Sequence, residues 1–329
     1  MKQKRQRFLF RHIYLVILFV ILASDVIYAQ RFEHIVDYQV NFANVSYKGK
    51  QYVGIRSFQD QGQNYVLSVD PITLETYVLN RNACKIVAVT SIEKVPYFDS
   101  SLYMKSFKHV RSNEQVLQDA GIDFPFPKER GINLTIDLCP SHKPLDKIVF
   151  ETLFVAFKGV ENSLPVAISL SGKWILNHET DLQWLINLQN KGLLTITWIN
   201  HTYNHKVNKD PLNHNFLLAT GTDVNYEVIA NEKLMLSKGI VPSVFFRFPG
   251  LVSSNKIIEQ VLSFGLIPVG SDAWLAKGQH AKDGSIVLIH ANGNEEIGVQ
   301  DFIQLLKSEQ SNIKSKHWIL HDLHEGFQY

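Results

Sequence analysis

Two histidines stand four residues apart directly after a strand-like apolar run. His201 and His205 follow residues 193–199, and their spacing predicts two imidazoles on one face of a helical turn. Such a pair suits a divalent metal ion such as zinc. An isolated H-x-x-x-H is a weak signal, because many surface and core histidines share the spacing. The metal interpretation therefore depends on which residues the fold places beside the pair.

Other polar residues follow apolar runs in the same way. Arg247 lies in the sequence F-R-F-P-G, where a strand-like run ends in a rigid turn. An arginine in that position can hold a carboxylate through a bidentate pair. In parallel β/α barrels the C-terminal ends of the strands carry the active site, and the opposite ends serve stability. Five residues at predicted strand ends therefore form one candidate site: Asp137, His201, Arg247, Asp272 and His290.

The elements that position these residues alternate between strand-like and helical patterns over residues 131–329. Strict alternation predicts an α/β fold with a parallel sheet, most simply a (β/α) barrel of about seven strands, complete or incomplete. Thr222 and Asp223 suit the start of one helix, and Gly239 suits its end. The predicted strands are residues 132–137, 164–170, 193–199, 243–247, 266–269, 285–290 and 317–321, and the predicted helices are residues 144–158, 179–190, 223–238, 255–264 and 299–309.

The preceding part of the chain has a different pattern. Residues 30–95 alternate apolar and polar side chains in short runs separated by turn residues, which predicts a small all-β module. Residues 96–130 are expected to be an irregular linker, and F-P-F-P at 124–127 marks its boundary, because proline disfavours helix. Nothing in the module indicates chemistry, so we expect a packing or glycan-contacting accessory. Its predicted strands form a meander of residues 36–42, 52–58, 65–69, 76–79 and 86–89.

Residues 1–29 have the pattern of a signal peptide. A basic stretch precedes an apolar run at 13–23, and a small residue, Ala29, follows at a suitable distance for cleavage. An uncleaved anchor running on to Tyr28 is the alternative, but Asp25 interrupts it. We therefore expect an exported protein, periplasmic or secreted, with no membrane span beyond this segment.

The composition excludes several classes of protein. The chain of 329 residues is 45% hydrophobic, which excludes wholesale disorder, and its two cysteines exclude a cysteine-rich zinc module. Five of the 33 basic residues but one of the 31 acidic residues lie within residues 1–29. The remainder is therefore slightly acidic, and no nucleic-acid partner is expected.

Taken in order, four short motifs resemble those of the polysaccharide deacetylases, carbohydrate esterase family 4. The family's T-F-D-D-G-P is matched by T-I-D-L-C-P at 135–140, and its H-(S/T)-x-x-H by H-T-Y-N-H at 201–205. Its R-x-P-G is matched at 247–250, and its strand ending in L-x-H at 288–290. The resemblance covers about residues 131–310.

This resemblance implies a metal-dependent hydrolase that removes acetyl groups from an N-acetylated glycan, its expected partner. The implied cofactor is a divalent metal, zinc or else cobalt or another ion. Only Asp272 or Trp274 can correspond to the fourth family motif, which is poorly kept. The resemblance assigns a general base to Asp137, its orientation to Arg247, a general acid to His290, the metal to His201 and His205, and substrate contacts to Pro249, Trp274 and Leu288.

The main departure from the family is Leu138, which stands where the family has a metal-binding aspartate. Leucine cannot coordinate a metal, but residues 137–139 resemble the Asp-Leu-Cys triplet of a subgroup of the family, which would make them a working variant. Three outcomes therefore stay open. Asp137 shifts to the metal; another residue supplies the missing ligand; or the chain binds little metal and is a catalytically inactive glycan-binding protein on the same barrel. The residues considered for the missing ligand are Cys139, His214 and Asp223.

Two further sets of side chains leave alternatives open. Cys139 is predicted to form a disulfide with Cys84, to remain a buried thiol, or to bind the metal. The trio His317, His321 and His324 has suggestive spacing, but a solvated or hydrogen-bonded set is favoured over a second metal site.

Overall fold

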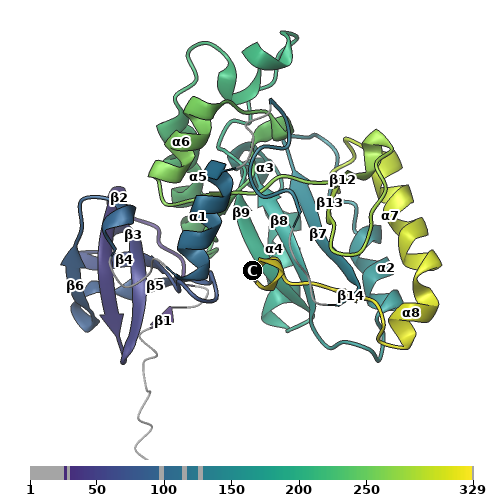
Figure 1. The fold of residues 1–329 in the computed structure, drawn as a ribbon, viewed down its shortest axis with the longest axis horizontal. Helices are drawn as coiled ribbons and strands as arrows, with labels where there is room; N and C mark the ends of the chain where they lie inside the picture. The colour runs from purple at the N-terminus through teal and green to yellow at the C-terminus, as the bar shows by residue number, and fades with distance from the viewer. Residues whose placement is uncertain (1–25, 28–29, 96–99, 113–116, 125–128, 328–329) are drawn as a thin grey trace, which may run out of the picture.

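The protein contains a small antiparallel sheet beside a larger parallel sheet that is flanked by helices (Figure 1). A computed structural model describes residues 26–27, 30–95, 100–112, 117–124 and 129–327. The predicted signal peptide lies outside the described residues except for β1, Val26–Ile27, which pairs with β5. Among the described residues, no helix combines the length and apolarity that crossing a bilayer requires.

The small sheet contains the five strands that the alternation pattern predicted. Consecutive antiparallel pairing joins β2 through β5, as expected for a meander. β6 departs from the meander, because it returns to pair with β2 at the other edge of the sheet, giving the order β1-β5-β4-β3-β2-β6. The strands are β2 Val36–Tyr47, β3 Lys50–Asp60, β4 Gln63–Val69, β5 Thr76–Asn80 and β6 Lys85–Ala88.

The segment expected to be an irregular linker contains a helix, α1, at Leu102–Ser112, so that part of the prediction was wrong. The helix buries Tyr103, Phe107 and Val110, whose spacing places them on one face. Tyr103 donates a hydrogen bond to the Gly265 carbonyl at 2.5 Å, which attaches α1 to the larger sheet. α1 therefore lies between the two sheets (Figure 1).

The larger sheet is parallel in all its recorded pairings and confirms the α/β class. Its strand order is β11-β10-β9-β8-β7-β13-β12, with β14 also pairing with β7. β11 and β12 are the ends of this order in the described part of the chain, so the barrel is an incomplete, curled half-barrel. The strands are β7 Gly131–Leu138, β8 Leu164–Leu170, β9 Leu194–Asn200, β10 Phe245–Phe246, β11 Ile267–Pro268, β12 Ala273–Trp274, β13 Ile286–Ile289 and β14 Ile319–Leu320.

Helices cover this sheet, and the predicted ones are all present, α4 with the predicted bounds and the others with shifted ends. Asp223 caps α5 as expected, since its side chain accepts a hydrogen bond from the Tyr226 amide. The sequence missed the short helices α3, α8 and α9 and the two-residue strand β12. The remaining helices are α2 Ile148–Ala156, α3 Gly172–Asn177, α4 Glu179–Asn190, α5 Val224–Ser237, α6 Asn255–Ser263, α7 Glu296–Ser308, α8 Gln310–Lys314 and α9 Leu323–Gly326.

Strand β7 places chemistry and packing on opposite faces. Successive side chains of a strand alternate between the two faces of the sheet. Thr135 and Asp137 lie on the face that Arg247 contacts. Ile136 and Leu138 belong to the apolar core on the other face, which includes side chains of α2 and α7. Leu138 is therefore a core residue.

A buried ion pair and a shared core join the small sheet to the barrel. Arg56 on β3 and Glu232 on α5 are both fully buried, and Arg56 Nε lies 2.7 Å from Glu232 Oε2. Arg56 Nη2 donates to the other carboxylate oxygen at 2.8 Å, and Tyr38 donates a third hydrogen bond, to Oε2, at 2.8 Å. Apolar residues from both parts, such as Val53 and Phe245, belong to one core cluster.

Candidate functional site

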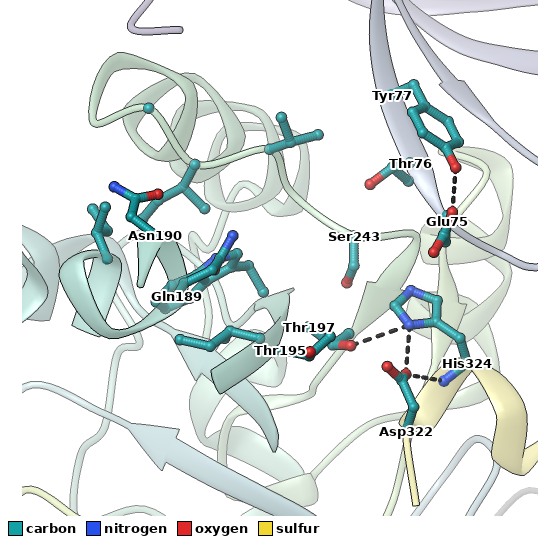
Figure 2. A pocket seen from close by; sticks show the side chains of 16 residues that line it. Glu75, Thr76, Tyr77, Gln189, Asn190, Thr195, Thr197, Ser243, Asp322 and His324 are labelled. Atoms are coloured by element: carbon teal, nitrogen blue, oxygen red, sulfur yellow. Dashed lines mark hydrogen bonds and ion pairs between the residues drawn. The ribbon is translucent and has the colours of Figure 1, made fainter. Parts of the chain in front are cut away.

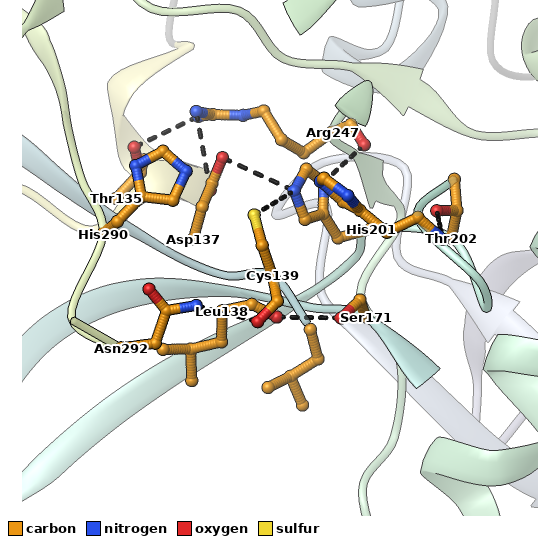
Figure 3. A network of polar contacts seen from close by, with 12 residues as sticks. Thr135, Asp137, Leu138, Cys139, Ser171, His201, Thr202, Arg247, His290 and Asn292 are labelled. Atoms are coloured by element: carbon orange, nitrogen blue, oxygen red, sulfur yellow. Dashed lines mark hydrogen bonds and ion pairs between the residues drawn. The ribbon is translucent and has the colours of Figure 1, made fainter. Parts of the chain in front are cut away.

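The predicted site residues converge at the C-terminal ends of β7, β9, β10 and β13. Figure 3 shows the Cys139 sulfur directed toward His201, with Asp137, Arg247 and His290 around it. Asp137 and His290 are 3% and 8% exposed, and Arg247 is fully buried. The structure thus brings together four of the five polar residues predicted from strand ends.

Asp272 is the exception. Its Oδ1 accepts a hydrogen bond from the Ile286 amide at 2.8 Å, and its Oδ2 accepts one from the Ser285 hydroxyl at 3.0 Å. Both partners lie at the N-terminal end of β13, whereas the site lies at the C-terminal end. The prediction that Asp272 belongs to the site was therefore wrong. The sequence did not reveal β12, which begins directly after Asp272, so Asp272 lies at the N-terminal end of a strand and not at a C-terminal end.

His201 and His205 lie side by side, but no helical turn brings them together. Their ring centroids are 4.7 Å apart, and residues 201–205 are irregular. Thr202 and His205 have φ angles of 69° and 46°, left-handed conformations that cost roughly 1–2 kcal/mol each for such residues. Two local hydrogen bonds oppose this strain: Thr202 N donates to Asn200 Oδ1 at 3.0 Å, and His205 N donates to Thr202 Oγ1 at 3.2 Å.

The hydrogen bonds of His201 orient its ring. Its Nδ1 lies 2.9 Å from the carbonyl oxygen of Arg247, and because a carbonyl only accepts, Nδ1 is the donor. In the neutral ring the lone pair is therefore on Nε2, which lies 3.5 Å from Cys139 Sγ and 3.7 Å from Asp137 Oδ2. Burial lowers the pKa of His201, but the combined effect of Asp137 and Cys139 is larger and opposite, so the net pKa lies above the usual value. A metal cation bound at Nε2 would interact favourably with Cys139 Sγ and Asp137 Oδ2, as a proton on this nitrogen does.

Three side chains could hold a metal ion at this point. The ligand atoms of Cys139, His201 and His205 all lie within 4.8 Å of one another, and the three residues are at most 8% exposed. His205 Nε2 is buried and has no hydrogen-bond partner, as expected of a nitrogen suited to a ligand. Soft sulfur and imidazole donors in this number suit zinc. The donor set therefore fits the implied cofactor.

The other residues considered for the missing ligand lie elsewhere. His214 is exposed in the 3₁₀ turn Leu212–His214, and the carboxylate of Asp223 caps α5. No disulfide joins Cys139 to Cys84; the Cys84 sulfur lies 3.4 Å from the Asn80 carbonyl. Of the residues weighed from sequence, Cys139 is the one whose donor atom reaches both histidines.

Arg247 contacts Asp137 less closely than a bidentate pair. Its Nη1 lies 3.7 Å from Asp137 Oδ1, and its Nη2 donates to Thr135 Oγ1 at 3.1 Å. Burial raises the pKa of Asp137, but Arg247, His201 and His290 together lower it below the usual value. Asp137 is therefore an ionised carboxylate at neutral pH, held near one fixed cation.

His290 has a partner that sequence reasoning missed. Its Nδ1 lies 2.8 Å from Glu295 Oε2, an oxygen that also accepts a hydrogen bond from Trp274 Nε1 at 2.7 Å. Burial lowers the pKa of His290, whereas Cys139, Glu295 and Asp137 raise it well above its usual value. The only sequence signal for Glu295 is an acidic residue five positions after His290.

Of the three residues expected to contact substrate, Trp274 alone is partly exposed. Its ring lies 5.8 Å from that of His290. Leu288 is 1% exposed on β13, two residues before His290, and Pro249 is buried at the start of a 3₁₀ turn, Pro249–Leu251. Trp274 is therefore the one of the three that offers a surface to a bound molecule.

Gly250 completes the R-x-P-G motif for a steric reason. Its φ is +60°, and a Cβ added there would lie 2.5 Å from Phe216 Cζ. The Phe216 ring in turn packs edge-on against His205, with centroids 6.0 Å apart. The glycine therefore leaves room for the ring that packs against His205.

A separate cavity of about 250 Å³ lies beside the N-terminal half of β9 (Figure 2). His324 Nδ1 lies 3.2 Å from Thr197 Oγ1 and 2.8 Å from Asp322 Oδ1 at its wall. His317 and His321 make other contacts, with Ser315 and with the Glu129 carbonyl. The C-terminal histidines thus do not form a metal site among the described residues.

Comparisons with known proteins give one family profile and several distant structures. A profile described as the RP012 protein N-terminal domain matches residues 36–104. A family 4 carbohydrate esterase from Bacillus anthracis is 17% identical, with 68% of this chain and 91% of that chain covered and a TM-score of 0.47. The family 4 carbohydrate esterase PdaA from Bacillus subtilis is 15% identical, with 63% and 84% covered and a TM-score of 0.44. A family 4 pseudoenzyme from Bacillus anthracis is 11% identical, with 69% and 81% covered and a TM-score of 0.44. Likenesses this distant do not assign the chain to that family.

Proposed function

We propose that this protein is a metal-dependent hydrolase that removes acetyl groups from N-acetylated glycans, such as peptidoglycan. One observation carries the proposal. An ionised carboxylate, Asp137, and a protonated imidazole, His290, converge beside the cluster of Cys139, His201 and His205. Two titratable groups whose environments separate their pKa values are the usual arrangement of a general base and a general acid.

Asp137 is the general base in this proposal. The lowered pKa keeps it ionised, so it can accept a proton from the attacking water. Arg247 fixes the carboxylate from one side, and His201 Nε2 lies 3.7 Å away on another. A bound divalent ion would polarise the acetyl carbonyl and lower the pKa of a coordinated water. The cluster beside Asp137 is where such an ion would be held.

His290 is the general acid. The raised pKa keeps the ring protonated at neutral pH, and Glu295 contacts Nδ1, so Nε2 is the nitrogen that transfers a proton. The proton goes to the sugar nitrogen as its bond to the acetyl carbon breaks. Water supplies the remaining oxygen and hydrogen, so the products are acetate and a free amine.

The second candidate is a catalytically inactive glycan-binding protein on the same half-barrel. The observation that favours it is Leu138, because this position offers an apolar core side chain where the resembled family has a carboxylate ligand. In that case Trp274, which is partly exposed, would contact the sugar without turnover.

Export and the role of the small β-sheet belong to the proposal as well. Residues 1–29 have the pattern of a signal peptide, and a periplasmic or secreted location would give access to acetylated cell-surface glycans. The small sheet, which shares a core with the barrel, would act as a packing or glycan-contacting accessory.

Acetate release tests the proposal. The purified chain would be stripped of metal and assayed on acetylated peptidoglycan, chitin-like oligomers and an O-acetylated glycan, with zinc, cobalt or no metal. We expect release from an N-acetylated substrate with added metal, and its loss in His205→Ala. Binding of the glycan without acetate release under every condition would favour the inactive alternative.

A further inference from the structure

We propose that the sulfur of Cys139 is the third protein ligand of the metal, completing a Cys-His-His site. The inference deepens the proposed function and rests on it for the presence of a metal. The resembled family has its metal-binding aspartate at the position of Leu138, and Cys139 is the next residue along the chain.

The course of the backbone explains this shift by one residue. Leu138 is the last residue of β7, and strand alternation turns its side chain into the apolar core. Cys139 follows directly, and continued alternation places its side chain on the same face as Thr135 and Asp137, toward the site. Asn292 Nδ2 donates to the Cys139 carbonyl at 2.8 Å, and Ser171 Oγ donates to the Leu138 carbonyl at 3.0 Å. These bonds hold the backbone that carries the thiol.

The distance from Cys139 to His201 matches a tetrahedral zinc site, and the full set is slightly wider. Zinc–sulfur and zinc–nitrogen bonds of about 2.3 and 2.0–2.1 Å place tetrahedral ligand atoms roughly 3.3–3.7 Å apart. Cys139 Sγ lies 3.5 Å from His201 Nε2, and the whole set falls within 4.8 Å. A small movement of the side chains around a bound ion would close the wider pair.

The surroundings of the two histidines also fit. A metal-binding histidine usually donates its other ring nitrogen to a carbonyl or carboxylate, and His201 Nδ1 does so to Arg247. His205 Nε2 is buried without a hydrogen-bond partner, which is unfavourable unless a ligand or ion satisfies it. A structural thiol hydrogen-bonded to His201 would account for Cys139, but it would leave His205 Nε2 unexplained.

A thiolate ligand has two chemical consequences. Metal binding to Cys139 Sγ and His201 Nε2 displaces the one proton that this pair holds and releases it to solvent, so the divalent ion bound to a thiolate keeps a net positive charge. Soft sulfur also favours zinc or cobalt over magnesium or manganese, which prefer oxygen ligands. In addition, Asp137 remains available as the base.

The test uses the full chain, stripped of metal and kept reduced, with cobalt as a spectroscopic probe. Cobalt bound to a thiolate gives an intense near-ultraviolet charge-transfer band. We expect this band at one cobalt per chain in the wild type and in the matched control Cys84→Ser. We expect Cys139→Ser to lose the band and to bind zinc at least about 100-fold more weakly. A band or a zinc affinity unchanged in Cys139→Ser would overturn the inference.

A second variant keeps the test decisive if serine perturbs folding. Cys139→Asp supplies a carboxylate at the same position and should bind cobalt without the charge-transfer band, with thermal unfolding as the folding check. A folded Cys139→Asp that retains the band would contradict sulfur ligation by Cys139. Because these readouts need no substrate, they separate the two claims. A cysteine-bound metal without acetate release defeats only the proposed function, whereas metal-dependent release that is unaffected by Cys139→Ser defeats only this inference.

Discussion

Cys139 Sγ lies 3.5 Å from His201 Nε2, one residue beyond a leucine whose side chain packs on the opposite face of the sheet. This relationship changes how the first motif is understood. The substitution at Leu138 does not leave a gap in the site, because the structure never directs that position toward it. The sulfur that follows lies where the proposed metal site would take its third ligand.

Leu138→Asp should therefore destabilise the protein without improving metal binding. The new carboxylate would be buried among apolar side chains of β7 and the covering helices, at a cost of roughly 2–5 kcal/mol in the free energy of unfolding. Urea unfolding measures this cost, and Leu138→Met, which conserves volume, serves as the control, with a loss below about 1.5 kcal/mol. A stable Leu138→Asp variant that binds zinc more tightly would show that the side chain reaches the site.

Glu295→Gln should move the alkaline limit of activity to lower pH. Burial lowers the pKa of His290, and Cys139, Glu295 and Asp137 raise it to a net value well above the usual range. A metal bound to Cys139 would offset the thiolate charge, which leaves Glu295 as the anion in contact with Nδ1. Because His290 acts in its protonated form, activity is retained below its pKa and lost as the pH rises through it.

The pH profile of kcat/KM for acetate release measures this shift. Glu296→Gln is the matched control, since Glu296 is paired with Lys143 on the surface and should leave the profile unchanged. An alkaline limb that stays in place in Glu295→Gln would remove Glu295 as a positioning residue for His290.

The ion pair between the small sheet and the barrel should contribute strongly to stability. Glu232→Gln leaves Arg56 buried without its charged partner, and breaking such a pair costs about 3–5 kcal/mol. Urea unfolding should show this loss, together with partial recovery in the double variant Arg56→Met/Glu232→Met. Glu179→Gln breaks an exposed pair with Lys238 and should change stability by less than about 0.5 kcal/mol. Equal losses of stability in Glu232→Gln and Glu179→Gln would contradict a stabilising role of the buried ion pair.

Much of the fold could be predicted from the sequence because the strands of the half-barrel are short apolar runs with clear boundaries. β8 and β9 were predicted within a residue of their ends. The helix α1 was missed because Lys and Ser residues alternate with its apolar residues, and because the prolines at 124–127 led us to expect an irregular linker. The pairing of β6 with β2 depends on contacts distant in sequence, which local alternation does not encode.

The candidate site was predictable to the extent that its residues stand at strand ends. Asp137, Arg247 and His290 have this signal, and they converge as expected. Alternation along β7 places Cys139 on the face of Asp137, but its choice over His214 and Asp223 was not predictable, because the positions of those two depend on the irregular segment after β9. Glu295 was missed because its contact with His290 follows from the loop before α7 and from no local pattern.

The most direct test of this account measures zinc content and acetate release together in Asp137→Asn. In the proposed mechanism Asp137 transfers the proton, and Cys139, His201 and His205 bind the metal. The variant keeps the shape of the side chain but removes the proton acceptor, so turnover should fall about 10²–10⁴-fold while the zinc content stays at the wild-type value. Wild-type turnover on a verified substrate, or loss of zinc together with activity, would contradict that division of roles.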